Sequence, residues 1–140
     1  TKNNVEIETL KVNHPGGSYA YKITSNGKSI VFCPDNEIIN TPDAETTTQQ
    51  LAEFFADVDL LIHDSQYTEE EIESKRGWGH SDVKSVIELV NQCKPKKFVA
   101  FHHDPTRTDS QLDQILAFYK NCINSEIEIF VAKEGHDIIV

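Results

Sequence analysis

Residues 98–105, Phe-Val-Ala-Phe-His-His-Asp-Pro, place two imidazoles and a carboxylate directly after an apolar segment. Four apolar residues without alternation predict a strand buried on both faces, and Pro105 prevents a helix from starting at once. Ligands of open α/β sheets bind beyond the carboxyl ends of the strands. We therefore expect His102, His103 and Asp104 to lie close to a reactive centre.

The same residue types follow the other predicted strands, which favours a metal site. These residues are His14, Asp35, His63 and Asp64 at strand ends and His80 in a glycine-rich loop. Imidazole and carboxylate are the ligands that zinc, iron and manganese share in proteins, and a neighbouring glycine lets the backbone approach a metal. A single histidine of this kind is usually a surface group, and an aspartate after a proline usually forms a turn. The recurrence at successive strand ends makes the metal site the better interpretation.

Strands that could position these residues are recognisable from alternation and turn chemistry. We expect a half-buried strand over residues 5–12, with a bulge where its alternation changes phase. Asn26-Gly27 between two β-like runs, 18–24 and 29–33, predicts a hairpin. Further strands are expected over 59–63, 126–132 and 137–140, the last two around Gly135.

Helices alternate with the later strands, which predicts an α/β fold. A helix should begin near Thr48, and the capping box that opens with Thr68 should start a short acidic helix ending near residue 75. Ser81 is expected to cap a third helix, and Thr108 to begin the last one. Their apolar stripes should pack against the sheet.

Composition limits the class of protein. The chain has 140 residues, 38% of them hydrophobic, and a net charge of −10, which argues against general affinity for a phosphate backbone. Because the sequence has no membrane-length apolar run and no leader, we expect a soluble, cytoplasmic protein with no membrane partner. Cys33, Cys93 and Cys122 are widely spaced, so buried free thiols are expected.

Five short motifs, in this order, resemble the C-terminal half of a metallo-β-lactamase-fold metallohydrolase of the ribonuclease Z and phosphodiesterase branch. They are His14-Pro15-Gly16-Gly17, Pro34-Asp35, Leu61-Ile62-His63-Asp64, Gly79-His80-Ser81 and Phe101-His102. The resemblance implies about one half of an αβ/βα sandwich, with one mixed β-sheet and flanking helices. Residues 1–140 would then be a single domain piece.

The resemblance also implies a dinuclear centre with a metal-activated water and two divalent metal ions, zinc above manganese or iron. His14 would bind the first metal, Asp35 would bridge both, and His102 would bind the second. His80 would be the catalytic acid, and Asp64 would support it where the family has glutamate. No role is implied for His63, His103 or His136.

The chain lacks the His-x-His-x-Asp-His motif that supplies most metal ligands in this family, and it contains no methionine. We therefore expect a fragment that is inactive alone and that associates with a missing N-terminal half or with a second copy.

The expected activity of the complete protein is hydrolysis of a small ester or phosphodiester, with nucleic acid a less favoured substrate. Alternatives are a lactonase or thioesterase, a diiron oxidoreductase on the same fold, and a metal-free regulatory or interaction domain. A receiver-like doubly wound domain ranks last, because the first strand does not end in an acidic pair.

Overall fold

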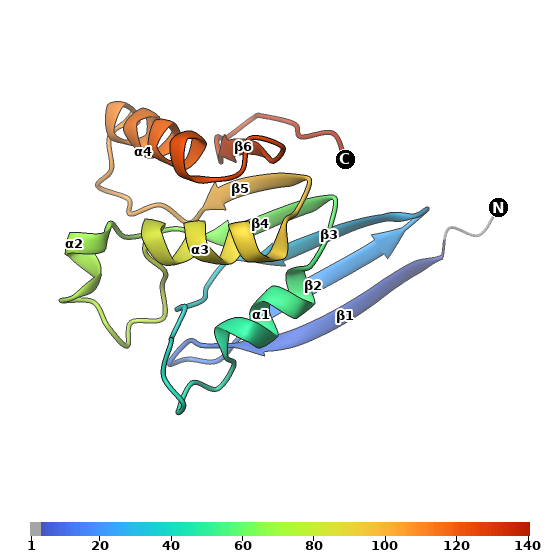
Figure 1. Ribbon diagram of the computed structural model, residues 1–140, viewed down its shortest axis with the longest axis horizontal. Coiled ribbons are helices and arrows are strands. Elements are labelled where there is room, and N and C mark those ends of the chain that lie inside the picture. The colour runs from blue at the N-terminus through green and yellow to red at the C-terminus, as the bar shows by residue number, and fades with distance from the viewer. Residues whose placement is uncertain (1–3) are drawn as a thin grey trace.

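The structure is a computed structural model that describes residues 4–140 and contains one six-stranded mixed sheet (Figure 1). The strands lie side by side in chain order. They are β1 (Val5–Val12), β2 (Ser18–Ser25), β3 (Lys28–Cys33), β4 (Leu60–Asp64), β5 (Lys97–Phe101) and β6 (Glu128–Val131). Only β2 runs against the others, because both of its pairings are antiparallel and the pairings from β3 to β6 are parallel. The carboxyl ends of β1, β3, β4, β5 and β6 therefore share one edge of the sheet.

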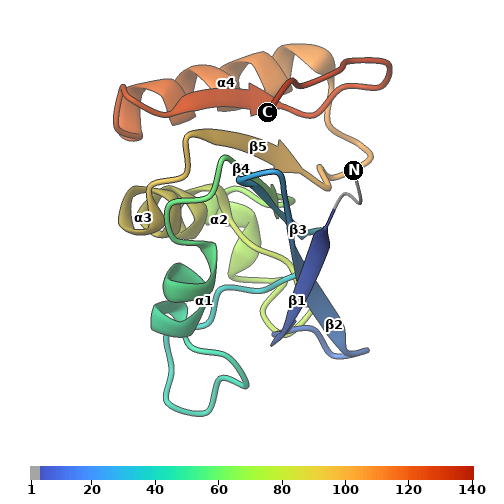
Figure 2. The same ribbon diagram turned by 90° about the vertical axis from the view of Figure 1, so that its right-hand side faces the viewer.

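Helices cover one face of this sheet. They are α1 (Thr48–Phe55), α2 (Glu69–Ile72), α3 (Val83–Cys93) and α4 (Asp109–Cys122). Figures 1 and 2 show α1 and α3 over the same side of the sheet, with α4 beside β5 and β6. The α/β fold class expected from the sequence, one mixed sheet with flanking helices, is confirmed.

The core lies between the sheet and the helices. Alternate strand residues such as Val31, Leu61 and Phe98 are fully buried on this side, where they join Leu51 and Phe55 of α1 in one cluster. Each such side chain contributes about 1.5–3 kcal/mol by leaving water. The apolar stripes predicted for α1 and α3 therefore hold these helices against the sheet, whereas α4 buries only Tyr119 of its predicted stripe.

The opposite, helix-free face of the sheet is apolar and partly open. Tyr19, Tyr21 and Ile23 of β2 and Val5 and Ile7 of β1 are exposed large apolar residues on this face. Near β3 to β6 the same face is hollowed by a cavity of about 470 Å³, lined partly by C-terminal residues. We expected an exposed sheet face from the resemblance to half a sandwich.

Local turn and cap chemistry explains much of the chain path. Asn26 and Gly27 have φ values of 52° and 74°, as the two central residues of a type I′ hairpin turn require. Capping boxes begin α2 at Thr68 and α4 at Thr108, as predicted.

In the part of the chain that the structure describes, no helix is long and apolar enough to span a membrane.

Three expectations about strands and cysteines are wrong. β1 has no bulge, because its pairing with β2 runs unbroken from Val5↔Ser25 to Val12↔Ser18. The alternation changes phase because Val5 and Ile7 lie on the helix-free face, whereas Val12 belongs to the core. Residues 137–140 form no strand; the ammonium group of Lys97 instead holds the carbonyl of Ile139. Cys122 is exposed, unlike the buried Cys33 and Cys93.

The receiver-like alternative is also excluded. A doubly wound receiver-type sheet has the strand order 2-1-3-4-5. Here the strands follow chain order and the first two pairings are antiparallel.

Candidate metal centre

Four strands that end at the same edge bring distant parts of the sequence together. His14 follows β1, Asp35 follows β3, Asp64 ends β4 and His102 follows β5. His80 reaches this edge from the loop before α3. One ligand atom from each of Asp35, Asp64, His80 and His102 can be chosen so that all four lie within 4.8 Å of one another. The parallel arrangement of the strands produces this cluster.

Asp64 fixes the ring of His80. Its Oδ2 lies 2.6 Å from His80 Nδ1, and its Oδ1 accepts a hydrogen bond from the backbone N–H of Ser81 at 3.0 Å. The side chain of Asp64 is fully buried, so few other groups compete for its oxygens. The hydrogen bond to Asp64 raises the pKa of His80, although partial burial opposes this effect. This pair favours an imidazolium with Nδ1–H directed at Asp64 and Nε2 left free.

Asp35 and His102 form the second part of the cluster. His102 Nε2 lies 3.3 Å from Asp35 Oδ1, and His102 Nδ1 lies 3.8 Å from Asp64 Oδ2. Within residues 4–140, the buried Nδ1 of His102 has no hydrogen-bond partner. His102 also has a φ of 56°, which is uncommon for a residue other than glycine and turns the chain sharply at the end of β5.

The donor set fits a divalent metal ion. Two carboxylates and two imidazoles are the nitrogen and oxygen ligands that zinc, manganese and iron accept. The ring of His102 stacks on that of His80 with centroids 4.8 Å apart and 18° between the planes. The unpartnered ring nitrogen of His102 supports the same interpretation, since a buried polar atom without a partner is costly.

His14 lies beside this group of four and does not belong to it. Its ring meets that of His80 edge to face, with centroids 5.5 Å apart. The backbone N–H of Gly16 donates to His14 Nδ1 at 3.2 Å, which leaves Nε2 as the available nitrogen. The site residues predicted from the sequence are therefore neighbours, and His14 lies at the margin of the group formed by the other four.

A buried polar network that the sequence did not reveal supports the strand ends. Asn36 Nδ2 donates to His63 Nε2 at 3.1 Å, and His63 Nδ1 donates to the carbonyl of Asp64 at 2.7 Å. His63 is fully buried, and this burial lowers its pKa. Asn13 donates to the carbonyls of Glu37 and Thr46. His63 is thus a structural residue.

Ser81 has a different role from the helix cap predicted for it. Asp82 is the N-cap of α3 and accepts from the N–H of Ser85, whereas Ser81 Oγ donates to the carbonyl of Asn36 at 2.5 Å. The pattern Ser81-Asp82 offers two capping residues in succession, and local sequence alone does not choose between them. Here the Ser81 hydroxyl is engaged by Asn36 and by the N–H of Ile38, and Asp82 provides the cap.

The residues after His102 shape the loop. Asp104 accepts hydrogen bonds from the N–H and hydroxyl of Thr106, at 2.9 and 2.6 Å. His103 is partly buried, and burial lowers its pKa. His136 lines the cavity on the helix-free face.

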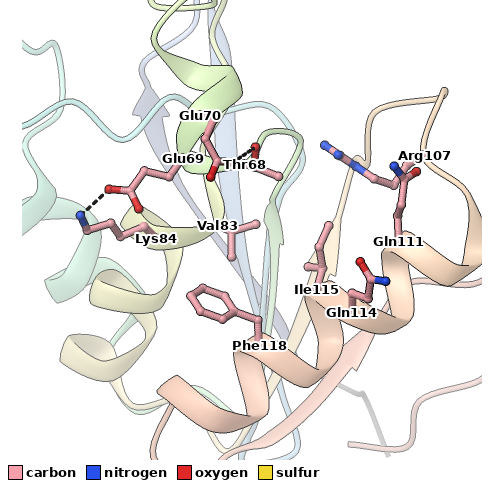
Figure 3. A pocket seen from close by; sticks show the side chains of 10 residues that line it. All are labelled: Thr68, Glu69, Glu70, Val83, Lys84, Arg107, Gln111, Gln114, Ile115 and Phe118. Carbon is pink, nitrogen blue, oxygen red and sulfur yellow. Dashed lines mark hydrogen bonds and ion pairs between the residues drawn. The ribbon is translucent and has the colours of Figure 1, made fainter.

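A separate groove of about 350 Å³ lies between α4 and the region of α2 and α3 (Figure 3). Phe118 and Ile115 of α4 and Val83 of α3 provide its apolar walls, and Lys84 pairs with Glu69 at its rim. None of the five site residues predicted from the sequence lines this groove.

The mixed sheet, with helices on one face and His and Asp donors along its carboxyl edge, defines half of a metallo-β-lactamase-type sandwich. The family model described as "Beta-lactamase superfamily domain" matches residues 2–103, and the chain belongs to this family.

Similar proteins agree with this fold. Two relatives, both named ribonuclease Z, are 25% identical over 114 residues in Haloferax volcanii and 24% identical over 131 residues in Macrococcus caseolyticus. These matches cover 81% and 83% of this chain but only 32% and 39% of the relatives. The crystal structure of the metallo-beta-lactamase fold protein YhfI from Bacillus subtilis is 19% identical, with a TM-score of 0.73, and the match covers 94% of this chain and 48% of that one.

Proposed function

We propose that the complete protein is a metal-dependent hydrolase of phosphodiesters or similar esters. The observation that carries this proposal is that Asp35 and His102, proposed as metal ligands, converge with the His80–Asp64 pair, proposed as the acid and its support. Atoms of the four side chains lie within 4.8 Å of one another at the sheet edge where ligands bind. Membership of the superfamily supports metal-dependent chemistry, and the two relatives named ribonuclease Z support a phosphodiester substrate.

The proposed metal ligands in this chain are His14, Asp35 and His102. Asp35 and His102 are about one-third exposed and face each other at 3.3 Å, so a cation could replace their direct contact. Divalent cations held there, with zinc favoured, would supply Lewis acidity and make water a nucleophile at neutral pH. His14 would contribute from the margin through its free Nε2.

We propose that His80 protonates the leaving oxygen. Asp64 stabilises the cationic ring and fixes its orientation through a contact of 2.6 Å, while the side chain of His80 remains 14% exposed. An acid held in a fixed orientation beside the leaving oxygen is effective in such a step. Asp64 orients His80 and is not proposed as a metal ligand, because Ser81 N–H and His80 engage its two oxygens.

The three proposed ligands of this chain do not complete a dinuclear centre. We propose that the remaining ligands come from an N-terminal half or from a second copy that covers the helix-free face, so that residues 1–140 act as a single domain piece. The exposed apolar residues of β1 and β2 support this arrangement.

We favour a small ester or phosphodiester over a long nucleic acid, because the net charge of −10 disfavours contact with a phosphate backbone. The three cysteines are free thiols, which supports a reducing, cytoplasmic compartment.

Metal analysis together with turnover tests the proposal. The complete protein, in which residues 1–140 are joined by the remaining ligands, should retain metal when it is reconstituted with zinc, manganese or iron. It should then hydrolyse bis(p-nitrophenyl) phosphate, with a single-stranded RNA as a parallel substrate. Asp35→Ala and His102→Ala should lose metal, and removal of metal by a chelator should abolish turnover. Failure of the reconstituted protein to retain any of the three metals would overturn the proposal.

The acid assignment has its own expected result. His80→Ala should retain metal while turnover of a substrate with a poor leaving group falls about 10²- to 10⁴-fold. Loss of metal equal to that in His102→Ala would contradict the assignment.

A further inference from the structure

Glu37 is a buried carboxylate near the candidate centre. It is only 4% exposed, and among the described residues it forms no ion pair. Burying a charge is costly unless hydrogen bonds compensate for the lost water. The hydrogen-bond partners of Glu37 therefore indicate what its buried carboxylate does in the structure.

Those partners are backbone N–H groups of the loop that leads to His80. Gly77 N–H lies 3.1 and 2.9 Å from the two carboxylate oxygens, and Gly79 N–H donates to Oε2 at 3.0 Å. Charge-assisted hydrogen bonds of this kind are stronger than those between neutral groups. Glu37 thus holds the loop one residue before His80.

Glu37 itself is fixed to the other strand ends. Its N–H donates to the carbonyl of Asn13 at 2.8 Å, and Asn13 Nδ2 donates back to the carbonyl of Glu37 at 3.0 Å. Asn13 directly precedes His14, and Glu37 lies two residues after Asp35. Through its backbone and its side chain together, Glu37 therefore joins the segments that carry His14, Asp35 and His80.

The fit of the loop against His14 is close. A Cβ on Gly79 would lie 2.2 Å from His14 Cδ2 and 2.7 Å from Pro15 Cδ. Glu37 holds Gly79 from one side, and His14 and Pro15 limit it from the other. A small displacement of this loop would move both His80 and its neighbour His14.

We infer that Glu37 is a positioning residue of the hydrolytic site, acting through the backbone of Gly77 and Gly79 to hold His80 in place. This inference rests on the proposed function for its kinetic consequence, but the clamp itself can be measured without activity.

Amide hydrogen exchange in the metal-free protein tests the clamp. Glu37→Gln keeps the size of the side chain, but its NH₂ group faces an N–H where the carboxylate offered an acceptor. Exchange at Gly77 and Gly79 should become roughly five- to tenfold faster, while α3 is unchanged. Unchanged exchange at both glycines would overturn the inference, as would an equal rise throughout the chain.

Kinetics with two leaving groups tests the consequence. With diphenyl phosphate, whose leaving group needs a proton, kcat of Glu37→Gln should fall roughly 10- to 100-fold. With bis(p-nitrophenyl) phosphate the loss should be much smaller, and KM should change less than about threefold for both. His80→Ala should show the same dependence. Equal losses with both substrates would indicate a merely structural role and overturn the kinetic inference.

Glu73→Gln is the matched control, because it removes the same charge from an exposed side chain whose one ion pair within residues 4–140 is with Arg76. It should behave as the wild type in both assays. If Glu37→Gln does not fold, as judged by circular dichroism, Glu37→Asp takes its place, since the shorter carboxylate cannot reach both glycines. If the complete wild-type protein hydrolyses neither ester, the proposed function fails and hydrogen exchange alone decides the clamp.

Discussion

At the scale of single residues, the site depends on a close approach between the backbone of Gly79 and the ring of His14. Gly77 and Gly79 both have positive φ values, 81° and 92°, which disfavour side chains at either position. They differ in their surroundings, because a Cβ at Gly77 would meet nothing within 4 Å. Substitutions at the two glycines can therefore distinguish the cost of backbone strain from the cost of a steric clash.

Gly77→Ala should lower the free energy of unfolding by about 1–2 kcal/mol, through left-handed strain alone. Gly79→Ala should cost a further ~1–3 kcal/mol, because His14 and Pro15 must move to admit the methyl group. Urea denaturation of both variants, compared at equal m values, measures this difference. Equal losses of stability would show that the loop adjusts around the new side chain.

At the scale of elements, the strand starts are joined at the edge of the sheet opposite the candidate centre. Asp59, just before β4, accepts from Lys96 Nζ at 2.8 Å, from the backbone N–H of Ser29 at 2.9 Å and from Lys28 Nζ at 3.4 Å. These bonds connect the beginnings of β3, β4 and β5. Lys96 first, and then Ser29 and Lys28, hold the pKa of Asp59 well below its usual value.

A depressed carboxylate pKa makes the stabilisation depend on pH in a definite direction. The contribution of Asp59 is fully present above its unfolded pKa of about 3.9 and is lost as the pH falls from there toward the folded pKa. Asp59→Asn should therefore destabilise the protein more at pH 6 than at pH 3, as measured by urea denaturation. Asp113→Asn, an exposed residue of α4, is the control. A pH-independent difference between wild type and Asp59→Asn would contradict the interpretation.

At the scale of the whole molecule, the two faces of the sheet differ. One face is covered by helices (Figure 2). The other exposes aromatic and aliphatic side chains of β1 and β2. Tyr21 and Ile23 are 43% and 37% exposed. Monomeric proteins rarely expose large contiguous apolar patches, so this face is a candidate surface for the N-terminal half or second copy proposed above.

The double variant Tyr21→Lys and Ile23→Lys should reduce self-association and binding of a hydrophobic dye, as measured by sedimentation velocity and fluorescence. Its free energy of unfolding should change by less than about 1 kcal/mol, since both side chains are already partly in water. Phe118→Lys on α4, which also replaces an exposed aromatic residue, is the control. A monomeric wild type that binds no dye would contradict the proposed role of this face.

Much of the fold could be predicted because its signals are local. The hairpin turn at Asn26-Gly27, the capping boxes at Thr68 and Thr108, and the apolar stripe of α3 act over a few residues. The bulge wrongly predicted in β1 also came from a local signal. The alternation changes phase there because both faces of the strand carry apolar residues, and local alternation does not distinguish this case from a bulge.

The sequence by itself determined which residue types follow the strands and the glycine-rich loop, and the resemblance of its motifs to a known family then singled out His14, Asp35, Asp64, His80 and His102 as candidates. Only the tertiary structure decided how they meet, because the shared direction of β1, β3, β4 and β5 places their ends at one edge. It also decided the role of Glu37. Burial and the N–H groups of a loop about 40 residues away distinguish this carboxylate from a solvated one, and neither is encoded locally.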